Sequence, residues 1–170
     1  MKVTIGLSSG EEMENIYREE SQKVINYLIQ KGYSICWGVT SKLIRGIDQE
    51  QLMINGYTTN KYYNELDKTI KGKFELCDNT FNVKNKLFAE SDLVLFLPGG
   101  IGTISELFSF IEECRSNDIK KKIVIYNIEN HFDSTINLIK DLVARKFIFE
   151  DIFNYFIIVD NFNDFCKVIN

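Results

Sequence analysis

Short apolar runs alternate along this chain with longer segments whose apolar residues recur at helical spacing. The clearest run, Leu93 to Leu97, is continuously apolar, which is typical of a strand buried on both faces. From Ile104 to Cys114, apolar side chains follow the i, i+3, i+4 and i+7 spacing of one helix face. Further apolar runs lie at 3–7, 33–37, 123–126 and 156–159. This alternation predicts an α/β domain with a mainly parallel central sheet.

The other segments complete this pattern less clearly. Helices are expected over about 13–28, 47–54, 82–90, 104–117 and 133–143, and from 161 onward. The segment 56–82 shows no clear periodicity, so we expect only a short strand near 57–59 followed by irregular structure. At 170 residues with 45% hydrophobic content, the chain is predicted to form a single domain that spans residues 1–170.

The composition limits the partners that we expect. The chain has 20 Lys and Arg residues against 24 Asp and Glu residues, which argues against nucleic-acid binding but allows a local pocket for a small anion. It has neither a signal peptide nor an apolar run of about 20 residues, so neither export nor a membrane anchor is expected. The four cysteines form no C-x-x-C pair, which predicts reduced thiols and a cytoplasmic protein.

The stretch LPGGIGTISE holds the only proline and three of the ten glycines. A purely structural explanation is that Gly99, Gly100 and Gly102 allow positive φ at a strand-to-helix corner, while Thr103 and Glu106 form a capping box. The alternative is that the glycines let a phosphate approach backbone N–H groups at the positive end of the following helix. Only this second explanation accounts for the number of glycines. The spacing fits neither a P-loop nor a dinucleotide fingerprint.

Glu106 is the residue that could turn binding into chemistry, because it lies one turn into the same helix. A carboxylate there can polarise a water, or stabilise the positive charge that develops on a sugar ring as a glycosidic bond breaks. The alternative is a solvated or capping glutamate.

Other candidate residues carry less information. His131 is the only histidine, so neither a histidine-dependent triad nor a multi-histidine metal site is expected. Trp37 falls in a predicted strand and is expected in the core. Tyr57, Tyr62 and Tyr63 could stack on a base, although they lie in the segment with the least readable pattern.

The stretch PGGIGTISE resembles PGGxGTxxE, the signature of the LOG family of phosphoribohydrolases, whose members are often labelled lysine decarboxylases. The resemblance continues in TIGLSSG, which is similar to a family strand that ends in Gly-Ser-Ser. It also includes WGVTSKLIRG, at the place of a glycine-rich family segment, and NHFDSTINLIKDLVARKFI, which is similar to G-Y-Y-D-x-L followed by a helix and G-F-I. The resemblance therefore covers nearly the whole chain.

This resemblance implies a Rossmann-like, three-layer α/β/α fold, usually dimeric. It implies hydrolysis of the N-glycosidic bond of a nucleoside 5′-monophosphate, which releases free base and ribose 5-phosphate. Neither a cofactor nor a metal is expected, and no lysine is placed to form an aldimine with pyridoxal phosphate. The phosphate would be held by residues of two loops, and Glu106 would be the catalytic carboxylate. The phosphate-binding residues would be Gly99, Gly100, Gly102, Thr103, Ser8 and Ser9.

Several positions depart from the family pattern. The family's catalytic arginine falls on Val83 and the lysine that follows it falls on Lys84, so Lys84 is the first candidate for the missing positive charge. Lys86 is a weaker candidate, and simple solvation explains either lysine. Either lysine would lack the planar fork of a guanidinium. Arg45, in the second loop, has this group and could replace the missing arginine in space. Ser105 stands where many members have a second glutamate.

We interpret these departures as an altered substrate more readily than as lost activity, because the glycine turn and Glu106 are intact. The competing hypothesis is a binding module without turnover, since related Rossmann-like domains act as nucleotide sensors or as molybdenum-cofactor carriers. The loss of the arginine at Val83 favours that hypothesis.

Overall fold

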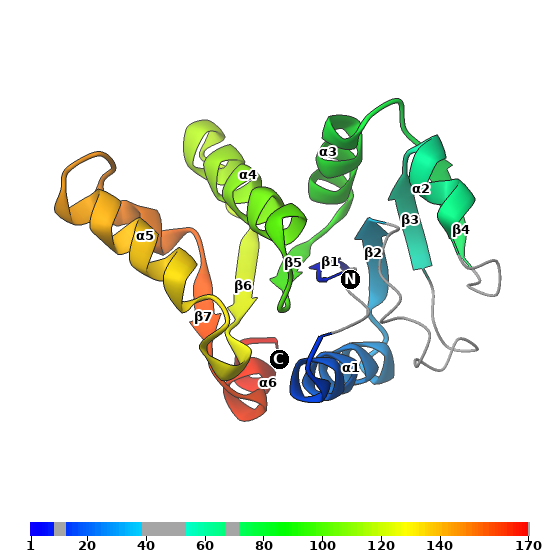
Figure 1. Cartoon of the computed structure of the whole chain (residues 1–170), viewed down its shortest axis with the longest axis horizontal. Coiled ribbons are helices and arrows are strands. Elements are labelled where there is room, and N and C mark those ends of the chain that lie inside the picture. Colours follow the sequence, from blue (N-terminus) through cyan, green and yellow to red (C-terminus); the bar gives the residue numbers. More distant parts are fainter. Residues whose placement is uncertain (9–12, 39–53, 67–71, 170) are drawn as a thin grey trace.

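The computed structural model describes residues 1–8, 13–38, 54–66 and 72–169, which form one sheet flanked by helices (Figure 1). The sheet has seven strands in the order β4-β3-β2-β1-β5-β6-β7, and all neighbouring pairs are parallel. The strands are β1 (Lys2–Gly6), β2 (Ser34–Gly38), β3 (Ile54–Thr58), β4 (Lys73–Leu76), β5 (Leu93–Phe96), β6 (Lys122–Tyr126) and β7 (Ile157–Val159). The helices are α1 (Asn15–Gln30), α2 (Asn60–Glu65), α3 (Thr80–Glu90), α4 (Ile101–Asn117), η2 (Ile128–Asn130), α5 (Asp133–Ala144), η3 (Glu150–Asn154) and α6 (Phe162–Ile169).

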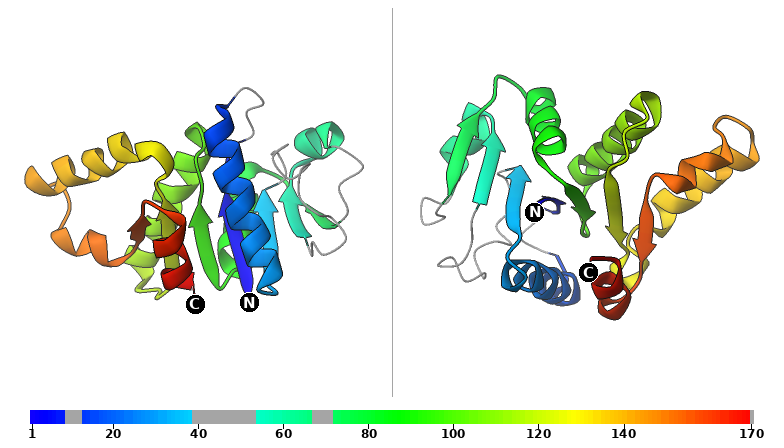
Figure 2. Two further views of the ribbon diagram at one scale, coloured as in Figure 1. Left: turned by 90° about the horizontal axis from the view of Figure 1, so that it is seen from below. Right: turned by 180° about the vertical axis from the view of Figure 1, so that it is seen from behind.

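The helices cover both faces of the sheet and make three layers. Helices α1 and α6 lie on one face, and α3, α4 and α5 lie on the other (Figure 2). The apolar run of β5 explains this arrangement, because successive side chains of a strand point to opposite faces. Leu93 and Leu95 pack in the core under α1 and α6, whereas Val94 and Phe96 pack in the core under α3, α4 and α5. The predicted α/β class, with a Rossmann-like three-layer arrangement, is confirmed.

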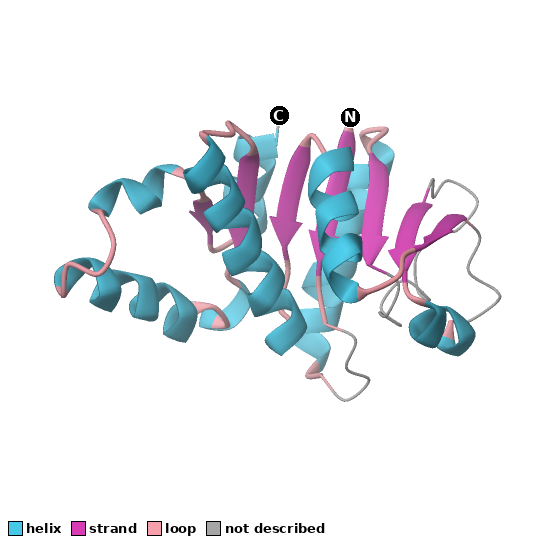
Figure 3. Cartoon of the chain, turned by 90° about the horizontal axis from the view of Figure 1, so that it is seen from above, coloured by secondary structure: helices cyan, strands magenta, loops and turns pink. Residues whose placement is uncertain are grey.

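The strand order changes direction between β1 and β5. The chain first builds the sheet outward from β1 to β4, and then returns to the other side of β1 to add β5, β6 and β7. Since all strands run the same way, their carboxyl ends share one edge (Figure 3). In open α/β sheets such a reversal leaves a crevice at that edge, where ligands bind.

The segment 56–82 departs from the prediction. Its strand begins earlier, at Ile54, and it contains both α2 and β4 where irregular structure was expected. The expected helix over 47–54 is wrong at Ile54, and its other residues lie outside the described part of the chain. The hydrophobic pattern did not predict the full length of β3, because Asn55 and Gly56 interrupt its apolar residues. The hydrophobic pattern did not predict β4, because this edge strand is largely exposed and partly charged.

Helix α4 carries Phe108, Phe110 and Ile111 on more than one face. Phe110 and Ile111 are buried in the chain's own core, and Phe108 packs against that core. These residues therefore supply no separate argument for a partner, and the homodimer stays a prediction from the resemblance, which sedimentation would test.

Among the described residues, no helix combines the length and the apolar character that a membrane span requires.

Candidate functional site

A cavity of about 270 Å³ opens at the reversal of strand order, and we call it the turn cavity. Its walls come from the carboxyl ends of β1 and β2 and from the first turns of α4. The lining residues are Ile5, Leu7, Ser8, Trp37, Gly38, Gly100, Ile101, Gly102, Thr103 and Glu106. Ser8 and the glycine turn, which are far apart in the sequence, therefore meet at one site. The backbone fixes their relation, because Ser8 N–H donates to the Pro98 carbonyl at 3.1 Å.

A second cavity of about 520 Å³, the side cavity, lies toward β3, α2 and α3. It shares Gly38, Ile101, Gly102 and Glu106 with the turn cavity, so the two spaces are neighbours with Glu106 in their common wall. The residues that line only the side cavity are Tyr57, Thr58, Thr59, Tyr62, Thr80, Val83, Lys84 and Ser105. The side cavity is the more apolar of the two, and it brings two of the three candidate tyrosines to the site. Tyr63 packs instead against Phe74, with ring centroids 6.3 Å apart.

The first turn of α4 has no side-chain cap. Gly100 is the N-cap residue, so Thr103 lies inside the helix and the predicted capping box is wrong. Within the described residues, Gly32 is the one glycine with positive φ, so left-handed backbone does not explain the glycines of this turn either. The first helical N–H groups have no intrahelical acceptor, and in the described part of the chain the N-cap residue gives them no side-chain hydrogen bond. The turn therefore presents backbone donors at the positive end of the α4 dipole.

The three glycines of the turn have different surroundings. A Cβ on Gly99 would lie 2.1 Å from Thr103 Oγ1, so Gly99 is required for the Thr103 side chain to pack over the turn. A Cβ on Gly100 or Gly102 would meet nothing within 4 Å. Both of these residues line the turn cavity. Packing thus explains Gly99, whereas Gly100 and Gly102 leave the backbone open to an approaching ligand.

The carboxylate of Glu106 lies at the ends of two strands where side chains are absent. A Cβ on Gly6 would lie 3.4 Å from Glu106 Oε2, and a Cβ on Gly38 would lie 3.8 Å from Glu106 Oε1. Burial in this narrow space raises the pKa of Glu106 to about 7, although the positive charge of Lys84 acts in the opposite direction. A carboxyl group with a pKa near neutrality, placed in a cleft, is typical of a catalytic acid or base.

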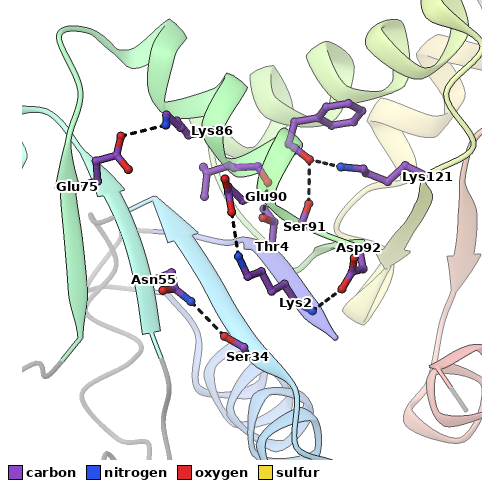
Figure 4. Close-up of polar contacts among 12 residues, drawn as sticks. Lys2, Thr4, Ser34, Asn55, Glu75, Lys86, Glu90, Ser91, Asp92 and Lys121 are labelled. Carbon is purple, nitrogen blue, oxygen red and sulfur yellow. Dashed lines mark hydrogen bonds and ion pairs between the residues drawn. The ribbon is translucent and has the colours of Figure 1, made fainter.

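The candidate cations fall in different places. Lys84 lines the side cavity, and its Nζ donates to Ser105 Oγ at 2.6 Å. Val83, where the resemblance places the family's arginine, is buried and lines the same cavity. Lys86 instead pairs with Glu75 at 3.1 Å and lines neither cavity (Figure 4). Arg45 lies outside the described residues, as does Ser9.

The sequence did not indicate that His131 belongs near this site. Its Nε2 lies 3.1 Å from the backbone nitrogen of Gly99 and 2.9 Å from the Gly99 carbonyl oxygen. The one available signal was the stretch NHFD, in which histidine stands where the similar family stretch has a tyrosine. Trp37 is buried as expected, and it also forms part of the wall of the turn cavity. In the described ranges no group of three or more His, Cys, Asp or Glu side chains is placed to hold a metal ion.

Three solved structures share this fold with the chain at low sequence identity. The molybdenum cofactor binding protein from Rippkaea orientalis has a TM-score of 0.69 at 14% identity, over 99% of this chain and 94% of that one. The molybdenum cofactor carrier protein from Chlamydomonas reinhardtii has a TM-score of 0.66 at 10% identity, over 94% and 89%. The X-ray structure of TM1055 has a TM-score of 0.57 at 16% identity, over 72% of each chain.

Sequence comparison places the chain in a family. No curated protein matches the chain in a sequence search. A family model described as "Possible lysine decarboxylase" matches residues 44–169, which is well over half of the chain and includes the glycine turn, Glu106 and every residue that lines the side cavity except Gly38. The match agrees with the resemblance of PGGIGTISE to the LOG signature. The chain belongs to this possible lysine decarboxylase family, the LOG family.

Proposed function

We propose that this protein hydrolyses the N-glycosidic bond of a nucleoside 5′-monophosphate and releases free base and ribose 5-phosphate. The observation that carries the proposal is the position of Glu106. Its carboxylate, with a pKa near 7, lies in the wall between a cavity that suits a phosphate and a cavity that suits a base. Membership of the LOG family supports the same reaction class.

The turn cavity would hold the phosphate. The uncapped N-terminus of α4 offers backbone N–H donors and a positive dipole end, which together form a ready site for an anion. Gly100 and Gly102 leave this backbone unobstructed, and Ser8 adds a hydroxyl from the opposite loop. Thr103 lines the same cavity and is only 4% exposed, so its position is fixed by packing.

The side cavity would hold the base. Tyr57, Tyr62 and Val83 give it an apolar and aromatic lining, which suits a flat heterocycle, and Lys84 and Ser105 add polar groups at one wall. The sugar would then lie beside Glu106, where the two cavities meet. Ionised Glu106 would stabilise positive charge on the sugar ring, or accept a proton from the attacking water. Water adds to the anomeric carbon, and the base leaves with the electron pair of the broken C–N bond and gains a proton.

The lining of the side cavity also bears on the substrate. Val83 replaces a planar guanidinium with an apolar side chain at the wall of this cavity, while the turn cavity keeps its glycines. We therefore propose that the base or sugar, rather than the phosphate, differs from the substrates of other family members.

A binding module without turnover is the second candidate. Two observations favour it: the missing arginine at Val83, and the fold likeness to two proteins described as molybdenum cofactor binding and carrier proteins. This candidate predicts tight binding of a nucleotide or phosphorylated cofactor with no release of product.

The test is to incubate the purified protein with a panel of nucleoside 5′-monophosphates, including N6-modified adenylates, and to quantify free base and ribose 5-phosphate. Release from at least one member, absent with the corresponding nucleosides, is expected if the phosphate is recognised in the turn cavity. Binding of several members without release from any would refute the hydrolase and favour the binding module.

The pH dependence of the reaction should follow Glu106. Because burial raises the pKa of Glu106 to about 7, the ionised form is lost as pH falls through 7. We expect kcat/KM to fall about tenfold per pH unit below 7 and to level off above it, since this ratio reports the free enzyme. The substrate phosphate also ionises near pH 6, and this affects kcat/KM as well. Measuring ribose 5-phosphate binding over the same pH range distinguishes this effect from the ionisation of Glu106. A profile that rises toward low pH would instead identify Glu106 as a proton donor.

A further inference from the structure

His131 connects two loops that follow neighbouring strands. It lies between η2 and α5, after β6, and its ring reaches the glycine turn that follows β5. Nε2 is within hydrogen-bond distance of both Gly99 N–H, at 3.1 Å, and the Gly99 carbonyl, at 2.9 Å. A single ring nitrogen accepts the first bond in one tautomer and donates the second in the other. In either state the imidazole holds the backbone of Gly99.

The segment that carries His131 is itself firmly placed. Glu129 and Asn130 adopt left-handed backbone, with φ of 48° and 58°, a conformation that costs energy in residues other than glycine. Asn127, which is buried, accepts a hydrogen bond from Phe132 N–H through Oδ1 at 2.7 Å. Phe132 is fully buried in the core. The tight turn and its anchors therefore direct the imidazole at Gly99.

The ring of His131 also has aromatic neighbours that keep it in place. It packs edge-on against Tyr17 of α1, with centroids 5.6 Å apart, and against Phe132, with centroids 4.9 Å apart. Gly99 is thus held from two directions, by His131 at its backbone and by Thr103 over its Cα. Since Gly99 is engaged in this way, the donors that face the turn cavity come from Gly100 onward.

We propose that His131 is a positioning residue, which fixes the glycine turn in the geometry that receives the substrate phosphate. The inference rests on the proposed function, because it assumes that the turn cavity binds a phosphate. His131 lines neither cavity, so it acts through Gly99 rather than on the ligand. Its loss should leave the turn folded but less well ordered, and phosphate binding should then cost additional ordering entropy.

The test compares His131→Phe with His131→Gln, using ribose 5-phosphate and inorganic phosphate as probes in calorimetric titrations. Phenylalanine keeps a ring against Tyr17 and Phe132 but cannot hydrogen-bond to Gly99, whereas glutamine keeps a donor and an acceptor. We expect His131→Phe to weaken both probes about tenfold and to leave the melting temperature within a few degrees of the wild type. We expect His131→Gln to restore binding to within about threefold.

The outcomes separate this inference from the proposed function. If the wild type binds neither probe, the phosphate site fails and the role of His131 fails with it. If the wild type binds and His131→Phe binds equally well, only the role of His131 is overturned. It is also overturned if His131→Gln binds as weakly as His131→Phe, because ring packing and not the hydrogen bond would then be responsible. With an active substrate, the effect should appear in KM with kcat nearly unchanged.

Discussion

Replacing Glu106 with glutamine should lower the rate of base release by a factor of about 100 to 10,000, which is the range typical of a lost general acid or base. Glutamine has nearly the same shape as glutamate, so it should fit the space beside Gly6 and Gly38 without a clash. It can neither carry negative charge nor accept a proton from water at neutral pH. The measurement is single-turnover release of ribose 5-phosphate, with binding of ribose 5-phosphate as a check that the site is intact.

The same substitution should make the fold more stable at high pH. In the folded protein the pKa of Glu106 is raised from 4.5 to about 7, so between these values the folded state keeps a proton that the unfolded state has lost. The wild type therefore loses stability as pH rises through this window, by up to about 3 kcal/mol above pH 7. Glu106→Gln has no carboxyl group to ionise at this position, so it does not lose this stability. Denaturant unfolding should show the variant to be more stable than the wild type at pH 8 and nearly equal to it at pH 4.5.

A matched control separates the site from the helix. Glu113 lies on α4 as well, but it is exposed and lines neither cavity, so Glu113→Gln should leave the activity unchanged. If Glu106→Gln retained full activity, Glu106 would have no role in the mechanism. If its stability followed pH like that of the wild type, the pKa of Glu106 would not be raised in the folded protein.

The sequence predicted the strands and helices whose burial leaves a pattern in their own residues. A strand buried on both faces, such as β5, leaves a continuous apolar run, and a helix that covers a sheet leaves a periodic one. The glycine turn was recognisable because three glycines stand close together at a helix start, although packing against Thr103 explains Gly99. By contrast, β4 is an exposed edge strand with the sequence KFEL, and neither burial nor alternation distinguishes it from a loop.

The parts of the site that were missed depend on packing between distant segments. His131 and Gly99 are 32 residues apart, and their contact exists because β5 and β6 are neighbours that end at the same edge. The surroundings of Gly6 and Gly38 likewise depend on distant segments, because a Cβ on Gly6 would meet Phe96 at 2.6 Å and a Cβ on Gly38 would meet Leu87 at 3.3 Å. The capping box was wrong for the opposite reason: its spacing was correct, but the helix begins at Ile101, before Thr103, so the threonine is not at the cap.

An aspartate at Gly102 should block phosphate binding while leaving the fold intact. Gly102 has φ outside the left-handed region and open space around its Cα, so a side chain can be accommodated. It is the second residue of α4, where a negative charge interacts favourably with the helix dipole and a non-glycine residue is favoured over glycine. Gly102→Asp should therefore melt at or above the temperature of the wild type. The added carboxylate would compete for the donors that the phosphate needs, and its charge would repel the phosphate.

We expect Gly102→Asp to weaken ribose 5-phosphate binding about a hundredfold, which corresponds to about 3 kcal/mol. Gly102→Asn is the matched control, because it has the same shape without the charge. It should weaken binding less, and the difference between the two variants should shrink at high salt, where charge repulsion is screened. Equal losses for Asp and Asn would show that the cavity excludes any side chain at this position for steric reasons. Wild-type affinity in Gly102→Asp would mean that the phosphate does not bind at the start of α4, and the proposed orientation of the substrate across Glu106 would then be wrong.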